Sequence, residues 1–347
     1  MSTLQLIAKK AGVSAQTVSN VLSGRGVSKR RDAIERAKRI LQIADELGYR
    51  PDAAARAIRS GRTLQIGVVI RNDRYHPLCH QLAFESILGL NEGLLEQGYV
   101  LSIIRVMDLE SERMAQSRAM RENLLDGVVA LSYLPDWVEK RLSDHFEHVI
   151  WADSNIWLPE NCIRRDEKEA GMLAAKAAVN LGYKKMVWTG ERLDSGHYSD
   201  IQRWAGVKEV AQQHGCTVTH CNGAEAVGDQ AFALLDSLNR QTVVLAYDVY
   251  HARRIVAAGQ TLGMSPGYDY GLICCDDSQT TQSHWPSLSR VSFDRYELGY
   301  QAAQMLLQSL PGSGVQRAGR PAPSRMISGQ WFLGGCTAWG PDYQPVR

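Results

Sequence analysis

A short run near the amino terminus, AGVSAQTVSNVL at residues 11–22, constrains the fold of this chain more than any other segment. Apolar residues recur before it at the spacing of one helix face, at Leu4, Ile7, Ala8 and Ala11. Gly12 interrupts that helix and suits a turn that needs a positive φ angle. Ser14 stands where an N-cap is expected, ahead of a second short helix over residues 15–22. The run therefore predicts two short helices joined by a glycine turn.

The second of these helices separates apolar from polar side chains. Its predicted buried stripe consists of Val18, Val21 and Leu22. Its hydrogen-bonding residues point elsewhere and are Gln16, Thr17, Ser19 and Asn20. A helix, a glycine turn and a short polar helix form the arrangement of a helix-turn-helix, whose second helix lies in the major groove of DNA. A plain helical hairpin with a polar surface is the alternative, and the run alone favours DNA binding over it.

The charge of the chain is unevenly distributed. Residues 1–62 hold 13 lysines and arginines against five acidic residues, a net charge of +8, although the whole chain has a net charge of only +2. The remaining residues hold 26 basic against 32 acidic side chains, a net charge of −6. A small basic part joined to an acidic body favours a polyanionic partner for the basic part alone.

Two further segments extend the amino-terminal pattern, LGYRP at residues 47–51 and AAARAIR at residues 53–59. Together with the run AxxAGVSxxTVSxVL, they resemble the lactose-repressor/galactose-repressor family of bacterial transcription regulators, and the resemblance covers nearly the whole chain. It implies a helix-turn-helix DNA-binding domain over residues 1–50 and a hinge segment over 51–61. An effector-binding and dimerisation domain over 62–342 is expected to follow.

The recognition helix supplies the expected DNA contacts. Gln16 is the best candidate for contacting a base edge, with Ala15 and Asn20 beside it. The residues expected to bind phosphates are Ser14, Thr17 and Ser19. Two chains would present two such helices to a near-palindromic operator, and because half-site symmetry mirrors protein symmetry, we expect a homodimer. The carboxyl-terminal tail has no clear leucine heptad, so a dimer is preferred to a tetramer.

A third helix is expected after a loop at residues 24–27, with Ser28 as its cap. Its predicted apolar face consists of Ile34, Ala37, Leu41, Ala44 and Leu47, which would close a three-helix core. Compared with the family pattern, this segment is about four residues longer. We favour an extension of the helix by one turn, and an altered loop is the alternative.

The hinge segment follows Pro51, and Asp52 is a good N-cap for residues 53–59. Seven residues cannot hold a helix alone in water. The resemblance implies that the segment becomes helical only on DNA, in the minor groove under a dimer. It also implies that Ile58 wedges between base pairs, with Ala55 as a base-facing partner. A plain linker is the alternative.

From Leu64 onward the pattern changes to strands that alternate with helices, which predicts βαβ units and parallel sheets. The expected strands are 64–70, 100–104, 127–131, 149–151, 185–188, 217–219, 242–246, 270–275 and 288–293. The expected helices are 78–97, 112–125, 135–146, 168–181, 201–214, 229–238, 251–262 and 296–310. The predicted fold class is therefore an all-α helix-turn-helix headpiece joined to an α/β effector domain with parallel sheets.

The effector domain is similar to periplasmic sugar-binding proteins of two lobes, as the same family resemblance implies. The motifs that support this are GVV at 127–129, RWAG at 203–206, DD at 276–277, PSLSRV at 286–291 and Gly299. In that family the chain crosses between the lobes three times. We therefore expect one lobe at about 62–163 and 290–322, and the other at about 164–289 and 323–342.

The cleft between such lobes is the expected ligand site, because loops at strand ends meet there. The resemblance implies that Arg203 grips sugar hydroxyls and that Asp276 accepts hydrogen bonds at the end of a strand of the second lobe. It places Asp153 as an acceptor at the end of the fourth strand of the first lobe, and Arg71 at a pocket position after its first strand. A surface salt bridge or a helix cap is the alternative role of each residue.

Three departures from the family pattern bear on the ligand. Tyr247 precedes Asp248 where the family often has asparagine, and Phe293 stands where a polar pocket residue can occur, so both join the expected effector contacts. Arg71 is cationic where small polar residues are common, with Arg74 and His76 nearby. An arginine at that position can pair with a phosphate or carboxylate. An anionic sugar is therefore one hypothesis for the effector.

Several classes of protein are disfavoured. The chain has neither of the glycine-rich phosphate loops and no GxSxG elbow, and its seven scattered cysteines form no metal-ligand pattern, so no cofactor or metal is expected. Asp276 and Asp277 point to opposite faces of a strand, which argues against a catalytic pair. No apolar run approaches the roughly 18 residues of a membrane span, and no signal peptide is evident, which favours a cytoplasmic protein.

The sequence thus predicts a DNA-binding repressor of carbohydrate-utilisation genes, controlled allosterically by a small sugar or sugar derivative. A cytosolic sugar-binding protein without a role on DNA is the alternative, and the basic amino-terminal part argues against it. An enzyme with Asp276 and Asp277, or Asp153, as its catalytic carboxylates is disfavoured further.

Overall fold

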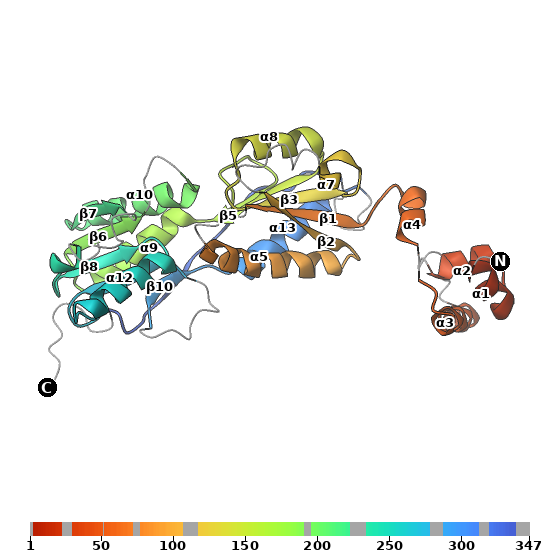
Figure 1. The fold of residues 1–347 in the computed structure, drawn as a ribbon, viewed down its shortest axis with the longest axis horizontal. Helices are drawn as coiled ribbons and strands as arrows, with labels where there is room; N and C mark the ends of the chain where they lie inside the picture. Colours follow the sequence, from red (N-terminus) through yellow and green to blue (C-terminus); the bar gives the residue numbers. More distant parts are fainter. Residues whose placement is uncertain are drawn as a thin grey trace. The chain divides into compact units, whose positions relative to one another are not determined.

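The computed structural model describes residues 3–22, 30–50, 52–71, 77–106, 117–190, 196–222, 234–277, 287–311 and 319–337. The chain divides into two compact units, Met1–Thr63 and Leu64–Arg347 (Figure 1). The division falls close to the predicted end of the hinge segment, after residue 61.

The first unit contains the helices α1 (Thr3–Ala11), α2 (Ala15–Leu22), α3 (Arg31–Glu46) and α4 (Ala53–Ser60). Gly12 has a φ angle of 69°, as its position in the turn between α1 and α2 requires. The hydroxyl of Ser14 accepts a hydrogen bond from the Thr17 amide at 3.1 Å and so caps α2. The local signals for the glycine turn and for the serine cap therefore act as predicted.

A small apolar core holds α1, α2 and α3 together, formed by Ile7, Ala8, Ala11, Val18, Ile40 and Ala44. The predicted face of α3 is partly wrong, because Ile34 and Leu41 are 42% and 51% exposed. The buried positions are Ala37, Ile40 and Ala44, which follow the 3.6-residue period of the side that contacts α1 and α2. The predicted loop at 24–27 and the cap at Ser28 lie outside the described residues.

Residues Ala53–Ser60 of the hinge segment form helix α4. Asp52 Oδ1 accepts hydrogen bonds from the amides of Ala54 and Ala55 at 2.9 and 3.3 Å, so the predicted N-cap is present. Gly61 ends the helix in the left-handed region, with a φ angle of 67°. Capping at both ends gives these eight residues partners for their terminal backbone groups.

The second unit contains two six-stranded sheets, as the alternation of strands and helices predicts (Figure 1). The first sheet has the order β11-β5-β4-β3-β1-β2 and is parallel throughout. Its strands are β1 (Gln65–Arg71), β2 (Val100–Val106), β3 (Gly127–Leu131), β4 (Val149–Ala152), β5 (Cys162–Arg165) and β11 (Arg325–Ile327). The helices of this lobe are α5 (Pro77–Leu95), α7 (Arg118–Arg121), α8 (Asp136–His145) and α13 (Arg295–Ser309).

The second sheet has the order β12-β10-β9-β8-β6-β7, and only the β10–β12 pair is antiparallel. Its strands are β6 (Lys185–Gly190), β7 (Thr217–Asn222), β8 (Thr242–Ala246), β9 (Gly271–Asp277), β10 (Ser289–Ser292) and β12 (Gln330–Phe332). The helices of this lobe are α9 (Glu167–Asn180), α10 (Tyr198–Gln213) and α12 (Val249–Thr261). The helix predicted at 112–125 is largely wrong, because residues 112–116 lie outside the described residues and only α7 is helical in the remainder. Residues 229–233 of the helix predicted at 229–238 also lie outside the described residues, and residues 234–236 are helical.

The chain crosses between the sheets three times, but two crossings lie elsewhere than predicted. Strand β10 pairs with β9 and so belongs wholly to the second sheet, which moves that crossing to residues 293–294. Strand β11 pairs with β5 in the first sheet, which moves the last crossing to residues 328–329. Strand β5 was not predicted, because a four-residue segment that ends in two arginines lacks an apolar strand pattern.

Close helix pairs build each lobe. In the second lobe, a Cβ at Gly171 of α9 would lie 2.1 Å from the carbonyl oxygen of Arg203 on α10. A Cβ at Gly206 of α10 would lie 2.2 Å from the carbonyl oxygen of Lys168 on α9. Only glycine permits this backbone contact, which fixes α9 against α10.

Among the described residues, no helix has both the length and the apolar character needed to cross a membrane.

Candidate effector site and DNA-binding helix

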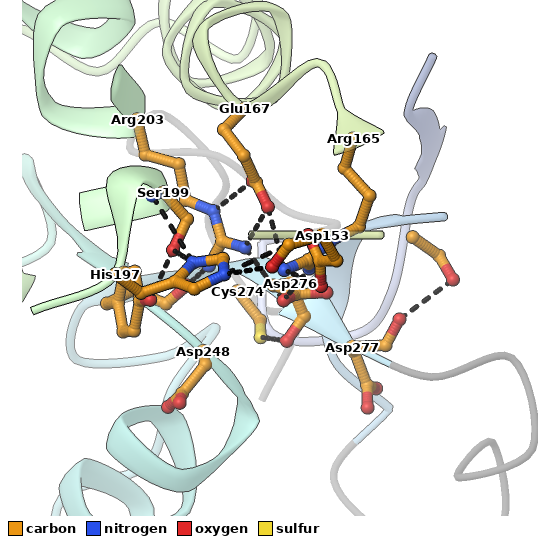
Figure 2. A network of polar contacts seen from close by, with 12 residues as sticks. Asp153, Arg165, Glu167, His197, Ser199, Arg203, Asp248, Cys274, Asp276 and Asp277 are labelled. Carbon is orange, nitrogen blue, oxygen red and sulfur yellow. Dashed lines mark hydrogen bonds and ion pairs between the residues drawn. The ribbon is translucent and has the colours of Figure 1, made fainter. Parts of the chain in front are cut away.

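The carboxyl ends of the parallel strands bring the predicted effector residues together. Asp153 directly follows β4, with a φ angle of 53°, and Tyr247 directly follows β8. Asp276 lies at the end of β9, and Arg203 projects from α10 toward it (Figure 2). Binding sites in open α/β sheets form at this edge, because the loops and side chains after the strands converge there.

Arg203 is held by the neighbouring helix. Its Nε donates to Glu167 Oε2 at 2.5 Å, and its Nη2 donates to Glu167 Oε1 at 2.9 Å (Figure 2). Its Nη1 donates to the carbonyl oxygen of Tyr247 at 2.6 Å. The close contact of α9 and α10 places the two side chains within reach, and the planar guanidinium matches the carboxylate as a bidentate pair. Arg203 is only 1% exposed, so its ion pair with Glu167 is buried.

Asp276 is surrounded by three arginines. Its Oδ2 accepts from Arg203 Nη2 at 2.7 Å and from Arg165 Nη1 at 2.6 Å, while its Oδ1 accepts from Arg295 Nη2 at 2.5 Å. Burial raises the pKa of the Asp276 carboxyl, but the charges of Arg295, Arg165 and Arg203 outweigh burial and hold the pKa well below its usual range. Asp276 is therefore a carboxylate at neutral pH.

Arg165 joins this group from the end of β5 in the first lobe. Its Nη2 lies 3.0 Å from both Asp153 Oδ2 and Glu167 Oε1, and its Nε donates to Asp153 Oδ1 at 3.1 Å. The guanidinium carbon also lies 5.2 Å from the centre of the Phe293 ring. Arg165 thus contacts the carboxylates of Asp153, Glu167 and Asp276 at once.

A second set of contacts reaches Asp153 from the start of α10. The Tyr198 hydroxyl donates to Asp153 Oδ1 at 2.7 Å, and His197 Nε2 lies 2.7 Å from the Asp153 carbonyl oxygen. His197 Nδ1 lies 2.7 Å from the Ser199 hydroxyl, which in turn lies 2.5 Å from the Tyr247 hydroxyl. The chain of polar contacts therefore extends from the first lobe to the end of β8.

The charges in this site change the pKa values of its titratable groups. Burial raises the pKa of Asp153, but Arg165, His197 and Tyr198 together bring it well below its usual range. Burial lowers the pKa of His197, and the charge of Arg165 lowers it further, although Asp153 opposes both. Burial also raises the pKa of Tyr247 far above its usual range, so this hydroxyl stays protonated.

Arg203, Asp276, Asp153 and Tyr247 thus lie in one polar network, and their binding of an effector stays a prediction. Arg71 lies at the end of β1, with its guanidinium carbon 5.0 Å from the centre of the Tyr133 ring. Phe293 is buried in the apolar core of the second lobe beneath Arg165, so its position favours support of Arg165 over direct ligand contact.

Sequence reasoning missed several members of the network, namely Arg165, Glu167, His197, Tyr198, Ser199 and Arg295. Helix α10 begins three residues earlier than predicted, which brings its first turn into the site. Within the described ranges, no group of histidine, cysteine and carboxylate side chains has the geometry of a metal site. The arrangement can hold a small polar molecule by charge-assisted hydrogen bonds.

The first unit presents the predicted DNA-contacting residues on α2. Ser14, Ala15, Gln16 and Asn20 are exposed, whereas Thr17 and Ser19 are half-buried. Gln16 Nε2 donates to Asn20 Oδ1 at 3.0 Å along the helix, so the two amides form one polar surface. On α4, Ala55 is half-buried and Ile58 is 85% exposed. The role of Ile58 as a wedge between base pairs stays a prediction.

Comparison with known proteins agrees with both units. Residues 3–52 match the model of the bacterial regulatory proteins of the lacI family, and residues 175–330 match a periplasmic binding protein-like domain. The transcriptional regulator AscG of Escherichia coli is 26% identical, over 95% of this chain and 96% of its own. The transcriptional repressor PurR of Vibrio vulnificus is 24% identical, over 89% of this chain and 92% of its own. The ribose operon repressor of Lactococcus lactis is 21% identical, over 94% and 97%.

Solved structures show the same fold. A lac repressor dimer bound to operator and the anti-inducer ONPF has a TM-score of 0.74 and 18% identity, covering 97% of this chain and 99% of the repressor. The regulator CelR in complex with cellobiose has a TM-score of 0.66 and 16% identity, covering 97% and 100%.

The fold and the site define a helix-turn-helix regulator with a two-lobed ligand-binding domain. The chain belongs to the lacI family of bacterial regulatory proteins. It is a DNA-binding transcriptional regulator and not an enzyme, as are the relatives that it matches along most of their length.

Proposed function

We propose that this regulator is a cytoplasmic homodimeric repressor of carbohydrate-utilisation genes, and that a small carbohydrate-like effector bound between its lobes controls its hold on operator DNA. The observation that carries the DNA part is the capped helix α2, which presents Gln16 and Asn20 to solvent. A short helix with exposed amides has the chemistry to contact base edges in the major groove.

The polar network supports a carbohydrate-like effector. Sugar hydroxyls both donate and accept, so they can bind the carboxylate of Asp276 and the guanidinium of Arg203 together. Among the relatives, one is named a ribose operon repressor and one structural neighbour is a complex with cellobiose. An anionic sugar is the narrower form of the proposal, and Arg71 at the end of β1 supports it as a partner for a phosphate or carboxylate.

Exposed apolar side chains support the homodimer. On the first lobe they are Phe84, Leu88 and Leu95 of α5, with Val100 and Ile103 of the neighbouring edge strand β2. Exposed apolar groups gathered on two adjacent elements are typical of a protein–protein interface. One structural neighbour is itself a dimer on its operator. A two-fold dimer would also place two copies of α2 on a near-palindromic site.

Two measurements test the proposal. Genomic fragments selected on the immobilised full chain should share a near-palindromic sequence, and a chain lacking residues 1–62 should select none. The melting temperature of the full chain should rise with a member of a panel of neutral sugars, sugar acids and sugar phosphates, because a ligand of the native state stabilises it. Arg71→Ala should abolish a shift caused by an anionic sugar, and an unchanged shift would refute the anionic form.

A further inference from the structure

Arg165 and Arg295 both reach Asp276 of the second lobe from the first lobe, and Arg165 in addition contacts a carboxylate of the first lobe, Asp153. Arg165 is the last residue of β5 in the first sheet, and directly after it the chain crosses to the second lobe for the first time. From there its Nη1 reaches Asp276 of β9 at 2.6 Å, while its Nε and Nη2 hold Asp153 of the first lobe (Figure 2). One guanidinium therefore bridges carboxylates of both lobes.

The groups expected to grip an effector are already occupied by the protein. Each of the three nitrogens of Arg203 has an acceptor, in Glu167, Asp276 or the Tyr247 carbonyl. Both oxygens of Asp276 have donors. A ligand that binds Asp276 Oδ2 has to take the place of one of the two arginines that donate to it.

Of these two arginines, Arg165 is the one that comes from the other lobe. Arg203 is fixed within the second lobe by its bidentate pair with Glu167 and by the glycine contact between α9 and α10. Arg165 instead rests on Phe293, at the second crossing between the lobes. Release of Arg165 from Asp276 removes a link between the lobes, whereas release of Arg203 would not.

We propose that Arg165 is a built-in substitute for the effector, which holds the two lobes together through Asp276 in the ligand-free protein and has to be displaced when a ligand engages Asp276. The second half of this inference rests on the proposed effector site. The first half concerns the ligand-free chain alone, and it is tested without any effector.

Hydrogen exchange of the ligand-free full chain provides the test. The Tyr198 amide donates to Asn155 Oδ1 at 2.8 Å, so a peptide spanning residues 196–204 reports a contact between the lobes. The β8 peptide, residues 242–246, reports the core of the second lobe. In Arg165→Met, exchange at 196–204 should accelerate at least tenfold, while exchange at 242–246 stays at the wild-type rate.

Arg290→Met is the matched control. Arg290 is also a buried arginine, but its ion pair with Asp277, at 3.8 Å, lies within the second sheet. Its loss should leave exchange at 196–204 at the wild-type rate. If Arg165→Met accelerates exchange in both peptides, Arg165→Lys is measured as well. Its single ammonium keeps the charge but cannot span the carboxylates of both lobes, so exchange at 196–204 should still be faster than in the wild type. The proposal would be overturned if residues 196–204 exchanged at the wild-type rate in both Arg165→Met and Arg165→Lys. It would also be overturned if Arg290→Met accelerated exchange at 196–204 as much as Arg165→Met.

Discussion

The Arg203 guanidinium donates to the Asp276 carboxylate over 2.7 Å, and both side chains are buried. Removing one partner of such a pair leaves an uncompensated buried charge, which costs about 3–5 kcal/mol. Arg203→Met should therefore lower the free energy of unfolding by roughly this amount in chemical denaturation. Lys168→Met is the control, because Lys168 also bridges α9 to α10, through Glu209, but at the surface. Its effect should stay within about 1 kcal/mol, and equal losses in both variants would contradict the prediction.

The recognition helix predicts a specific effect on DNA affinity. Gln16→Ala should weaken binding to a selected operator by about 1–3 kcal/mol, because the loss of a base-edge contact costs this much, while binding to unrelated DNA stays unchanged. Titration of labelled DNA at fixed salt measures both. Gln42→Ala is matched, since Gln42 is also exposed and also donates to a residue one turn ahead, Glu46. If both variants lost affinity equally, α2 would not be the recognition helix.

Acid should destabilise the second unit in two stages. Burial lowers the pKa of His197, so the unfolded chain binds its proton more readily, and stability falls as pH drops below the unfolded value of about 6.5. The lowered pKa values of Asp153 and Asp276 add stability that is present above about pH 4 and is lost as pH falls further.

The variant His197→Gln isolates the first stage. Between pH 7 and pH 5 its melting temperature should fall less than that of the wild type, since one proton accounts for at most about 1.4 kcal/mol per pH unit. His214→Gln, at the exposed opposite end of α10, should follow the wild-type curve. Parallel curves for all three proteins would show that His197 does not titrate in this window.

The exposed apolar side chains of the first lobe predict an effect on assembly. Leu88→Asp on α5 places a charge within the proposed interface, so it should raise the dimer dissociation constant by at least tenfold in sedimentation. Leu262→Asp, an equally exposed apolar position after α12, should leave the constant unchanged. A monomeric wild type, or a dimer indifferent to Leu88→Asp, would exclude this surface.

Local signals predicted local structure well. Gly12, Ser14 and Asp52 act through backbone groups within a few residues, so their roles can be inferred from the sequence alone. The resemblance to a family added Arg203 and Asp276, which lie 73 positions apart and meet. Arg165 and Arg295 could not be predicted, because their contacts depend on where the chain crosses between the sheets. The strand pairing of β10 and β11, which moves two of those crossings, is itself set by contacts distant in the sequence.

The glycine contact between α9 and α10 limits how such a protein can diversify. Gly171 and Gly206 bring two backbones within a distance that no side chain allows, and this contact fixes Glu167 against Arg203. A side chain of the first lobe such as Arg71 can therefore be exchanged without changing the contact between α9 and α10. A new side chain at either glycine would instead separate the helices and disturb the grip on every ligand at once. The second lobe therefore tolerates few substitutions near the site, and changes of ligand specificity are expected to arise in the first lobe.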